Sequence, residues 1–205
     1  MKILVFSEIK WSYLKTRKQH LLSRFPDSWY ILFFEPYKAD KPNNLKPVDV
    51  SRWVRNCTVP FLKNFDGVLK ALFGNIFIRV LFFYFSGIWI RKIIKKANVD
   101  KPDLVIVSNL YAVPYLHFKC PIIYDMNDDH LAFKNTPDWL KHQRETLFIM
   151  ADKIVVCSES LADLVPKQNK NKVVYIGNGV DVTVFMSSTY SAALTSQELD
   201  RAKSE

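Results

Sequence analysis

Residues 151–185, ADKIVVCSESLADLVPKQNKNKVVYIGNGVDVTVF, decide the fold that the sequence predicts. Lys153 to Val156 is a β-branched run that suits a strand buried on both faces of a parallel sheet. Ser158 or Ser160 then caps a short helix with an apolar stripe. Val173 to Ile176 is a second β-rich run. The stretch therefore predicts a strand, a helix and a second strand of one parallel sheet.

A sharp turn follows the second of these strands. Gly177 and Gly179 flank Asn178, and glycine lets the backbone turn where the strand ends. Open α/β sheets bind their ligands at the carboxyl edge of the strands. We therefore expect the functional side chains to gather at this edge.

The chain before residue 151 shows the same alternation of strands and helices. It predicts strands at Lys2 to Phe6, Trp29 to Glu35, Asn56 to Pro60, Asp103 to Val107 and Pro121 to Tyr124. It predicts helices at Tyr13 to Phe25, at Asn75 to Ala97 and after Thr136-Pro137, with residues 36–50 as an irregular loop and 167–171 as a polar loop. This order indicates an α/β fold, a Rossmann-like doubly wound parallel sheet in a single domain.

The first predicted helix has an apolar side and a basic side. Its inward residues are Leu14, Leu21, Leu22 and Phe25, and its outward residues are Lys15, Arg17, Lys18 and Arg24. The preceding loop, Ser7 to Ser12, has no glycine to bring backbone amides close to a phosphate, so Arg17 and Gln19 are candidate side-chain donors for a substrate. The alternative is the solvated face of an ordinary surface helix.

The helix predicted at Asn75 to Ala97 is the most hydrophobic part of the chain. Its uncharged part, Val80 to Ile90, would be about 16 Å long, against roughly 30 Å of hydrocarbon in a bilayer, so it cannot span one. One interpretation is a helix packed on the sheet. The other is a membrane contact on one side of the bilayer, through Phe82, Phe83, Tyr84, Phe85 and Trp89 beside the cations Arg91, Lys92, Lys95 and Lys96.

Length and composition limit the class of protein. The 205 residues suffice for one domain with a core, and 49% hydrophobic residues exclude a disordered chain. A formal charge of +9 favours an anionic partner, and without a recognisable nucleic-acid module we expect an anionic membrane surface and no nucleic acid. Three widely spaced cysteines and the absence of a signal peptide indicate a cytoplasmic protein, peripheral at the inner face of the plasma membrane if it contacts lipid.

The end of the strand at Pro121 to Tyr124 carries the densest group of chemical side chains. Asp125, Asn127, Asp128, Asp129 and His130 fall within six residues. Clustered carboxylates raise one another's pKa, so one of them can take a proton from an acceptor hydroxyl, and the histidine is an alternative base. The same acids can bind a divalent metal, or fix the loop by accepting backbone amides.

Several of these segments together resemble the N-terminal domain of GT-B glycosyltransferases. The strings ADKIVVCSESLADLV and VVYIGNGVDVTVF are similar to the strand, helix and NGVD segment that close that domain. The strings IIYDMNDDHLAF, RKQHLL and FFEP, with Glu145-x-Leu147, resemble the family 1/4 group that builds cell-surface and teichuronic-acid-type polysaccharides. The likeness covers residues 1–185, which implies one half of a GT-B fold.

The resemblance implies roles for individual residues. It places the catalytic candidates Asp125, Asp128 and His130 near an interdomain cleft, the substrate-binding candidates Arg17, Gln19, Asn127, Asp129, Glu145 and Ser158 around them, and Asn178, Gly179 and Asp181 at an interdomain hinge, with no metal site. Ser158 also stands at a strand end and a helix N-terminus, where it suits an anionic group or a simple N-cap.

In this family a second domain holds most of the nucleotide-sugar donor. We therefore expect residues 1–185 to bind no cofactor alone, and residues 186–205, a polar tail or truncated linker, cannot form that second domain. The leading hypothesis is the acceptor-side half of a glycosyltransferase, acting on a polysaccharide or lipid-linked acceptor with a donor-binding domain in trans. The alternative is a non-catalytic Rossmann-like module that binds a membrane surface or a protein partner.

Overall fold

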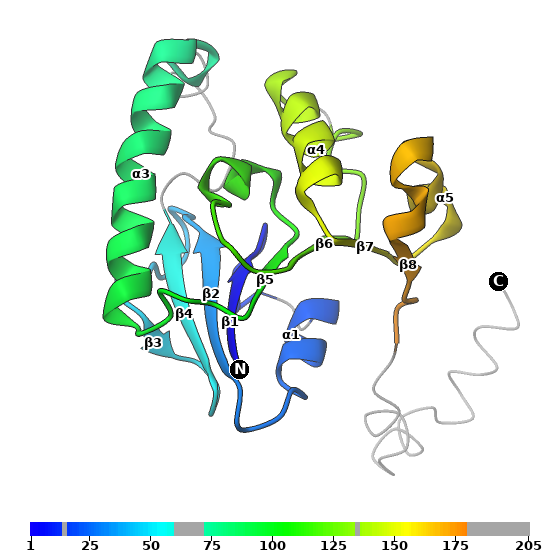
Figure 1. Cartoon of the computed structure of the whole chain (residues 1–205). Coiled ribbons are helices and arrows are strands. Elements are labelled where there is room, and N and C mark those ends of the chain that lie inside the picture. The colour runs from blue at the N-terminus through cyan, green and yellow to red at the C-terminus, as the bar shows by residue number, and fades with distance from the viewer. Residues whose placement is uncertain (14–15, 60–71, 134–135, 180–205) are drawn as a thin grey trace, which may run out of the picture.

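The computed structural model describes residues 1–13, 16–59, 72–133 and 136–179. Several residues of the sequence predictions lie outside these ranges: Leu14, Lys15, Pro60, Asp181 and the whole of 186–205. The described residues form a sheet with helices on both of its faces (Figure 1).

The sheet confirms the predicted doubly wound topology. Its strands are β1 (Lys2–Phe6), β2 (Tyr30–Pro36), β3 (Val48–Asp49), β4 (Val54–Val59), β5 (Leu104–Val107), β6 (Ile122–Met126), β7 (Lys153–Val156) and β8 (Val173–Tyr175). Among the described residues the order is β3-β4-β2-β1-β5-β6-β7-β8, and only β3 runs antiparallel to its neighbour. The chain therefore starts in the centre, winds to one edge and returns to wind to the other.

The helices divide between the two faces because this reversal changes the side on which a right-handed crossover lies. They are α1 (Arg17–Leu22), α3 (Ile76–Lys96), α4 (Trp139–Met150), α5 (Glu159–Asp163) and the 3-10 helices η1 (Leu110–Tyr115) and η2 (Lys167–Lys172). Residues of α3, η1, α4 and α5 pack into one core cluster, whereas α1 packs into a second cluster on the opposite face.

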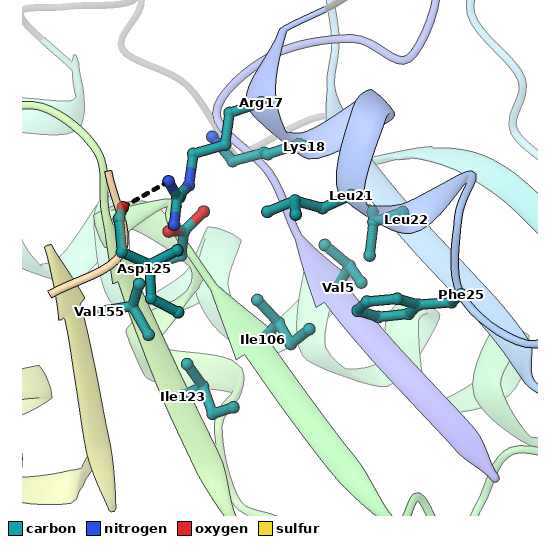
Figure 2. Close-up of a pocket in the computed structure, with 11 residues that line it drawn as sticks. Val5, Arg17, Lys18, Leu21, Leu22, Phe25, Ile106, Ile123, Asp125 and Val155 are labelled. Carbon is teal, nitrogen blue, oxygen red and sulfur yellow. Dashed lines mark hydrogen bonds and ion pairs between the residues drawn. The ribbon is translucent and has the colours of Figure 1, made fainter. Parts of the chain in front are cut away.

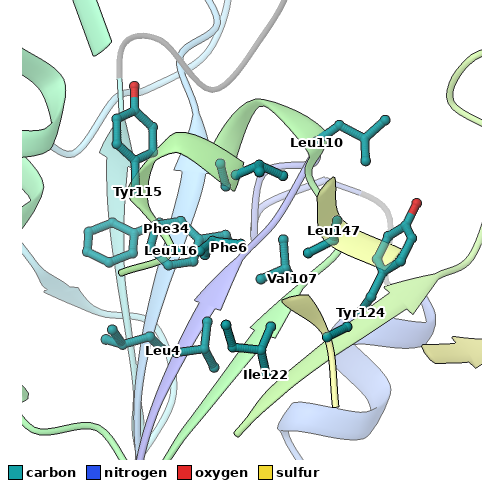
Figure 3. Close-up of a cluster of buried hydrophobic side chains, with 14 of the residues drawn as sticks. Leu4, Phe6, Phe34, Val107, Leu110, Tyr115, Leu116, Ile122, Tyr124 and Leu147 are labelled. Atoms are coloured by element: carbon teal, nitrogen blue, oxygen red, sulfur yellow. The ribbon is translucent and has the colours of Figure 1, made fainter. Parts of the chain in front are cut away.

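Alternate residues of the central strands supply these two clusters. Leu4 and Phe6 of β1 point into the larger cluster with Val107 of β5 (Figure 3), while Ile3 and Val5 point into the smaller one. All four β1 side chains are at most 1% exposed. This burial on both faces explains why β1 reads as a continuous apolar run.

The first helix differs from its prediction. It is only six residues long, Arg17–Leu22, instead of extending from Tyr13 to Phe25. Thr16 precedes it, and Gln19 Oε1 accepts a hydrogen bond from the Thr16 amide at 3.1 Å. Lys18, predicted to face outward, is buried because it pairs with Glu8, and Leu21, predicted to face inward, is 43% exposed.

Three other segments also differ in detail. Residues 36–50 were expected to be irregular but contain β3, which pairs with β4 as a short antiparallel ladder. The expected polar loop at 167–171 is the 3-10 helix η2, held where Asn169 Nδ2 donates to the Phe148 carbonyl at 3.0 Å. The helix expected directly after Thr136-Pro137 begins at Trp139.

Helix α3 occupies the span that the sequence predicted, and its packing on the core is confirmed, whereas the membrane contact stays a prediction. Asn75 caps it by accepting a hydrogen bond from the Phe77 amide at 2.9 Å. Ile90 and Ile94 are buried in the larger core cluster, whereas Tyr84 and Phe85 are exposed. No helix among the described residues is long and apolar enough to cross a membrane.

Candidate functional site

The carboxyl ends of the central strands bring together a group of polar side chains around Glu8. Lys18 Nζ donates to Glu8 Oε1, and Ser108 Oγ donates to Glu8 Oε2. Asn127 Nδ2 donates to Glu8 Oε1 at 3.2 Å. These residues follow β1, β5 and β6 or lie on α1, so four separate elements meet at this carboxylate, which we call the Glu8 cluster.

Short polar residues after each strand build this edge. Ser108 Oγ also reaches the Phe6 carbonyl at 3.3 Å, and Asn109 Nδ2 donates to the Ser7 carbonyl at 2.9 Å. Serine and asparagine side chains can bond to backbone groups where a strand ladder ends. They therefore hold the ends of β1 and β5 together and fix the position of Glu8.

Lys18 and Ser108 keep Glu8 ionised. Burial raises the pKa of the Glu8 carboxyl, but the charge and hydrogen bond of Lys18, with the hydrogen bond from Ser108, together hold that pKa below its ordinary value. An ionised carboxylate can only accept hydrogen bonds. Glu8 is therefore suited to accept a hydrogen bond from a substrate hydroxyl and not to donate one.

Asp125 lies beside the Glu8 cluster and has the opposite shift. Burial raises its pKa, and the nearby cations Lys18 and Arg17 do not offset that effect. Arg17 Nε lies 3.5 Å from Asp125 Oδ1 (Figure 2). A carboxylate with a raised pKa is a better proton acceptor near neutral pH than an ordinary one. The pKa values of the neighbouring acids Glu8 and Asp125 are therefore shifted in opposite directions from their ordinary values.

Arg17 and Gln19 are engaged by the main chain. Arg17 Nη1 donates to the carbonyls of Ile176 at 2.7 Å and Gly177 at 3.0 Å. Gln19 Nε2 lies 3.3 Å from the carbonyl of Lys10. Their predicted role as substrate donors stays a prediction, and in this structure they tie α1 to the segments that surround it.

A pocket of about 130 Å³ lies between α1 and the sheet, below this ionic group. Arg17, Lys18 and Asp125 stand at one end of the pocket, and Ile123 and Phe25 stand toward the other (Figure 2). The pocket thus suits an apolar group whose polar end meets the charges.

Of the predicted loop acids, Asp128 bonds to its own loop and Asp129 pairs with helix α4. Asp128 is exposed and its Oδ1 accepts from the Asp129 amide at 2.9 Å, while Asp129 Oδ1 pairs with Arg144 Nη1 at 3.0 Å. The Asp128 contact agrees with the alternative that these acids fix the loop by accepting backbone amides. A catalytic role for Asp128 and a binding role for Asp129 remain predictions.

His130 reaches the candidate site from the same loop. Its Nε2 lies 3.0 Å from the Ser108 carbonyl, and its ring stacks on Phe133 with the ring centroids 6.2 Å apart. The bond to Ser108 places the imidazole next to the residue that holds Glu8. His130 therefore stays a candidate base, with one ring nitrogen engaged.

The remaining candidates are not brought to the Glu8 cluster by any described contact. Glu145 is exposed on α4, and Asn178 and Gly179 are exposed beyond β8. Ser158 is the N-cap of α5, since its Oγ accepts from the Leu161 amide at 3.3 Å, which confirms the capping prediction. An anion-binding role for Ser158 stays a prediction. Substrate binding by Glu145 and the hinge role of Asn178 and Gly179 stay predictions as well.

Three buried polar atoms of the candidate residues and their partners lack a hydrogen-bond partner within the described part of the chain. They are Arg17 Nε, Asn127 Oδ1 and Arg144 Nε. Buried polar groups are normally paired, so such atoms mark places where a bound molecule would complete the hydrogen bonding. Among the described residues, no group of three or more His, Cys, Asp or Glu side chains could hold a metal ion.

A second ionic cluster lies deeper, between the ends of β1, β2 and β4. Lys10 Nζ is 3.0 Å from Glu35 Oε1, and each side chain is 2% exposed. Glu35 also accepts hydrogen bonds from the Trp11 amide at 2.8 Å, Asn56 Nδ2 at 3.1 Å and Thr58 Oγ1 at 3.1 Å. We call this group the Glu35 network.

Sequence reasoning missed Glu8, Lys18 and Ser108, the centre of the site. A signal was present, because Ser7-Glu8 and Ser108-Asn109 directly follow two predicted parallel strands. Parallel strands place their carboxyl ends at one edge, so this pattern would have placed both pairs there. The acids of residues 125–130 are closer together in the sequence, so the site was predicted at the end of that one strand.

Comparisons with known proteins support the fold. No family model and no curated protein matches the sequence. A solved sucrose-phosphate synthase structure from Thermosynechococcus elongatus matches with a TM-score of 0.53 and 10% identity, over 93% of this chain and 98% of its own. Another structure of that synthase gives a TM-score of 0.58 and 12% identity, over 90% of this chain and 49% of its own. The chain therefore shares an α/β fold with these two structures.

A third structure, UDP-GlcNAc 2-epimerase from Methanocaldococcus jannaschii, matches with a TM-score of 0.47 and 15% identity, over 87% of this chain and 46% of its own. The second synthase structure is the longer one, and this chain spans about half of its length, 49%. The predicted Rossmann-like fold is confirmed. The family 1/4 and teichuronic-acid assignment stays a prediction.

Proposed function

We propose that this chain is the acceptor-side domain of a glycosyltransferase that moves a sugar from a nucleotide-sugar to a polysaccharide or lipid-linked acceptor. The observation that carries the proposal is the pairing of Asp125, whose pKa is raised, with ionised Glu8 at the carboxyl edge of a GT-B-type sheet. Two neighbouring acids, one with a raised pKa and one held ionised, suit division into proton acceptor and orienting group. The resemblance to the family 1/4 and teichuronic-acid group favours a cell-surface polymer as product.

In the proposed reaction the acceptor hydroxyl attacks the anomeric carbon of the donor sugar. The new glycosidic bond forms as the bond to the nucleoside diphosphate breaks, and the hydroxyl proton passes to Asp125. Glu8, held by Lys18 and Ser108, accepts a hydrogen bond from a second hydroxyl and orients the acceptor. Holding both reactants in the reactive geometry supplies much of the rate enhancement in such a reaction.

The donor nucleotide is held by a second domain in this proposal. The family that the sequence resembles places most diphosphate contacts there, and Arg17 and Gln19, the donors on α1, are already bonded to backbone carbonyls. The carboxyl edge of the sheet, with the Glu8 cluster and Asp125, then binds the acceptor.

Calorimetry on the purified chain tests the assignment of sides. UDP-, GDP- and TDP-sugars should bind weakly or not at all, since the second domain supplies most of the diphosphate contacts. Micromolar binding of a nucleotide-sugar by this chain alone would overturn the acceptor-side assignment. Asp125→Asn serves as the site variant and Asp138→Asn, at an exposed acid before α4, as the matched control.

A non-catalytic module is the second candidate, and the engagement of Arg17 by two backbone carbonyls favours it. The Nη1 group of Arg17 is thereby used within the protein, although its buried Nε has no hydrogen-bond partner among the described residues. Turnover by the chain with a compatible donor-binding domain would exclude this candidate, and turnover unchanged by Asp125→Asn would remove the proposed base.

A further inference from the structure

Helix α3 has an outward face that is apolar along its first half. The exposed apolar side chains are Ile76, Phe77, Val80, Leu81, Tyr84 and Phe85. Positions 77, 80, 81, 84 and 85 follow the spacing of one side of a helix. Phe77 is 82% exposed, so the strip is solvated and not a margin of the core. We call these six residues the α3 strip.

The opposite side of the same half of α3 packs against the protein. Phe83 contacts Tyr115 of η1 and Trp139 of α4, with ring centroids 5.9 Å and 5.8 Å apart. The Arg79 guanidinium lies 4.8 Å from the centre of the Trp139 ring. The core therefore uses one side of the helix and leaves the α3 strip on the other.

The outward face becomes cationic in the second half of α3. Arg91, Lys92, Lys95 and Lys96 are exposed, and α3 contains no acidic residue. Within the described ranges none of these four cations forms an ion pair. One helix thus presents uncompensated positive charge next to exposed aromatic surface.

We propose that this face of α3 docks on an anionic lipid bilayer. Phe77 to Phe85 extend about 12 Å along the helix, which suits a helix lying flat with its apolar side chains in the interface. The cations then lie at the level of the lipid headgroups, where each basic residue adds attraction to an anionic surface. The inference does not depend on the proposed sugar transfer.

A pocket beside the cations fits a lipid headgroup. It has a volume of about 310 Å³ and is lined in part by Arg91, Lys95 and His117, with Asp100 as its acid. The bases outnumber the acid, so the pocket favours a phosphate. It lies on the flank of α3 next to the cationic half of the outward face.

The charge pattern favours a bilayer over a protein partner. Interfaces between proteins tend to exclude lysine from their centre, whereas helices that lie on membranes combine aromatic side chains with lysine and arginine.

Cosedimentation of the full chain with vesicles tests the proposal. The probe is phosphatidylserine mixed with phosphatidylcholine, compared with phosphatidylcholine alone, at roughly 0.1 M and roughly 1 M salt. The strip variant is Phe77→Ser/Phe85→Ser and the charge variant is Lys92→Glu/Lys96→Glu. The matched controls are Ile149→Ser/Tyr175→Ser, at side chains 72% and 62% exposed, and Lys141→Glu/Lys167→Glu, at exposed lysines elsewhere.

We expect the parent to sediment with anionic vesicles at low salt and to be released at high salt. The strip and charge variants should each bind at least about tenfold more weakly, with unchanged thermal midpoints, and both controls should bind like the parent. A parent that stays in the supernatant overturns the proposal, as do controls that lose as much binding as the variants. It is also overturned if the strip variant unfolds, or converts a parent dimer to a monomer, since the strip would then be core or an interface between copies.

Discussion

The Glu8 cluster and the Glu35 network use the same chemistry and differ in completeness. Each joins a carboxylate near the carboxyl edge of the sheet to a lysine of the segment between β1 and β2. Glu35 and Lys10 are 2% exposed, whereas the Glu8 side chain is 20% exposed. One pair is closed within the protein, and the other opens to the edge where ligands bind.

Hydrogen bonding shows what this difference means for function. Both oxygens of Glu35 accept bonds from the protein, and Lys10 Nζ also donates to the Pro42 carbonyl at 2.6 Å. A satisfied buried network has no capacity left for a ligand, and its role is to fix the strand ends. Beside Glu8, Asn127 Oδ1 has no partner among the described residues. Both oxygens of Glu8 accept bonds as well, so the greater exposure of Glu8 and the unpaired Asn127 Oδ1, more than charge, distinguish the Glu8 cluster as the candidate site.

The largest expected effect comes from breaking the closed network. Lys10→Met leaves the Glu35 carboxylate buried without its cation, and loss of one partner of a buried ion pair costs about 3–5 kcal/mol. Urea unfolding of the variant should show this loss of free energy. A cost below about 1 kcal/mol would mean that water reaches Glu35, and the distinction between the two groups would fail.

A surface pair provides the control for this experiment. Arg55 and Asp49 form an ion pair whose side chains are 44% and 72% exposed. Exposed pairs contribute about 0.2–1 kcal/mol, so Asp49→Asn should barely change the unfolding free energy. An equal cost at both sites would show that burial does not govern these pairs.

Replacing Asp125, the acid beside the Glu8 cluster, should reduce activity more than stability. In the chain supplied with a compatible donor-binding domain, Asp125→Asn should lower turnover by about 10²-fold, because positioned proton transfer is worth at least that much. This factor corresponds to about 2.7 kcal/mol of transition-state stabilisation. Steady-state kinetics measure it, with Asp138→Asn as the exposed control. Turnover within a fewfold of the parent, with folding intact, would direct attention to His130.

The contributions of Glu8 and Asp125 to folding stability should change with pH in opposite directions. The folded-state pKa of Glu8 is lowered, so its contribution to stability is present above its ordinary value of 4.5 and is lost as pH falls through the folded pKa. The pKa of Asp125 is raised, so stability falls as pH rises from its ordinary value of 3.8 through the folded pKa.

Unfolding measured across acidic pH checks these signs with isosteric variants. Glu8→Gln should make the protein less sensitive to acid, and Asp125→Asn should remove a loss of stability that the parent shows as pH rises. Identical pH profiles for the parent and both variants would show that the environments of the two acids do not differ.

Sequence reasoning predicted the sheet because the strands are local apolar runs. Lys2–Phe6 and Lys153–Val156 are observed within the segments where the pattern placed them. The helix limits were less predictable. The apolar side chains at Tyr13 to Phe25 suggested a long helix, but only Arg17–Leu22 is helical, since Phe25 packs with Trp29 as part of the approach to β2.

The site was harder to predict because its contacts are distant in sequence. Ser108 is 100 residues from Glu8, and Asn127 is 119 residues from it. Periodicity placed Lys18 on a solvated face, since nothing near it in sequence indicated a buried carboxylate. Asp125 was proposed from sequence because it follows the apolar run at Pro121 to Tyr124, and the structure places it within β6, near the carboxyl end of that strand.

The smallest expected effect concerns Arg17, which links Asp125, beside the Glu8 cluster, to the segment after β8. Its Nη1 donates to the carbonyls of Ile176 and Gly177, and the Ile176 amide in turn donates to the Val156 carbonyl at 2.9 Å. Ile176 is 45% exposed, so in Arg17→Ala water can replace the lost donor and the global cost should stay near about 1 kcal/mol. Hydrogen exchange should quicken at the Ile176 amide, while the Trp11 amide, bonded to Glu35, should exchange as in the parent. Equal acceleration at both amides would show that the surroundings of the Glu8 cluster and of the Glu35 network unfold as one unit. That result would contradict their separation into a candidate functional cluster and a structural network.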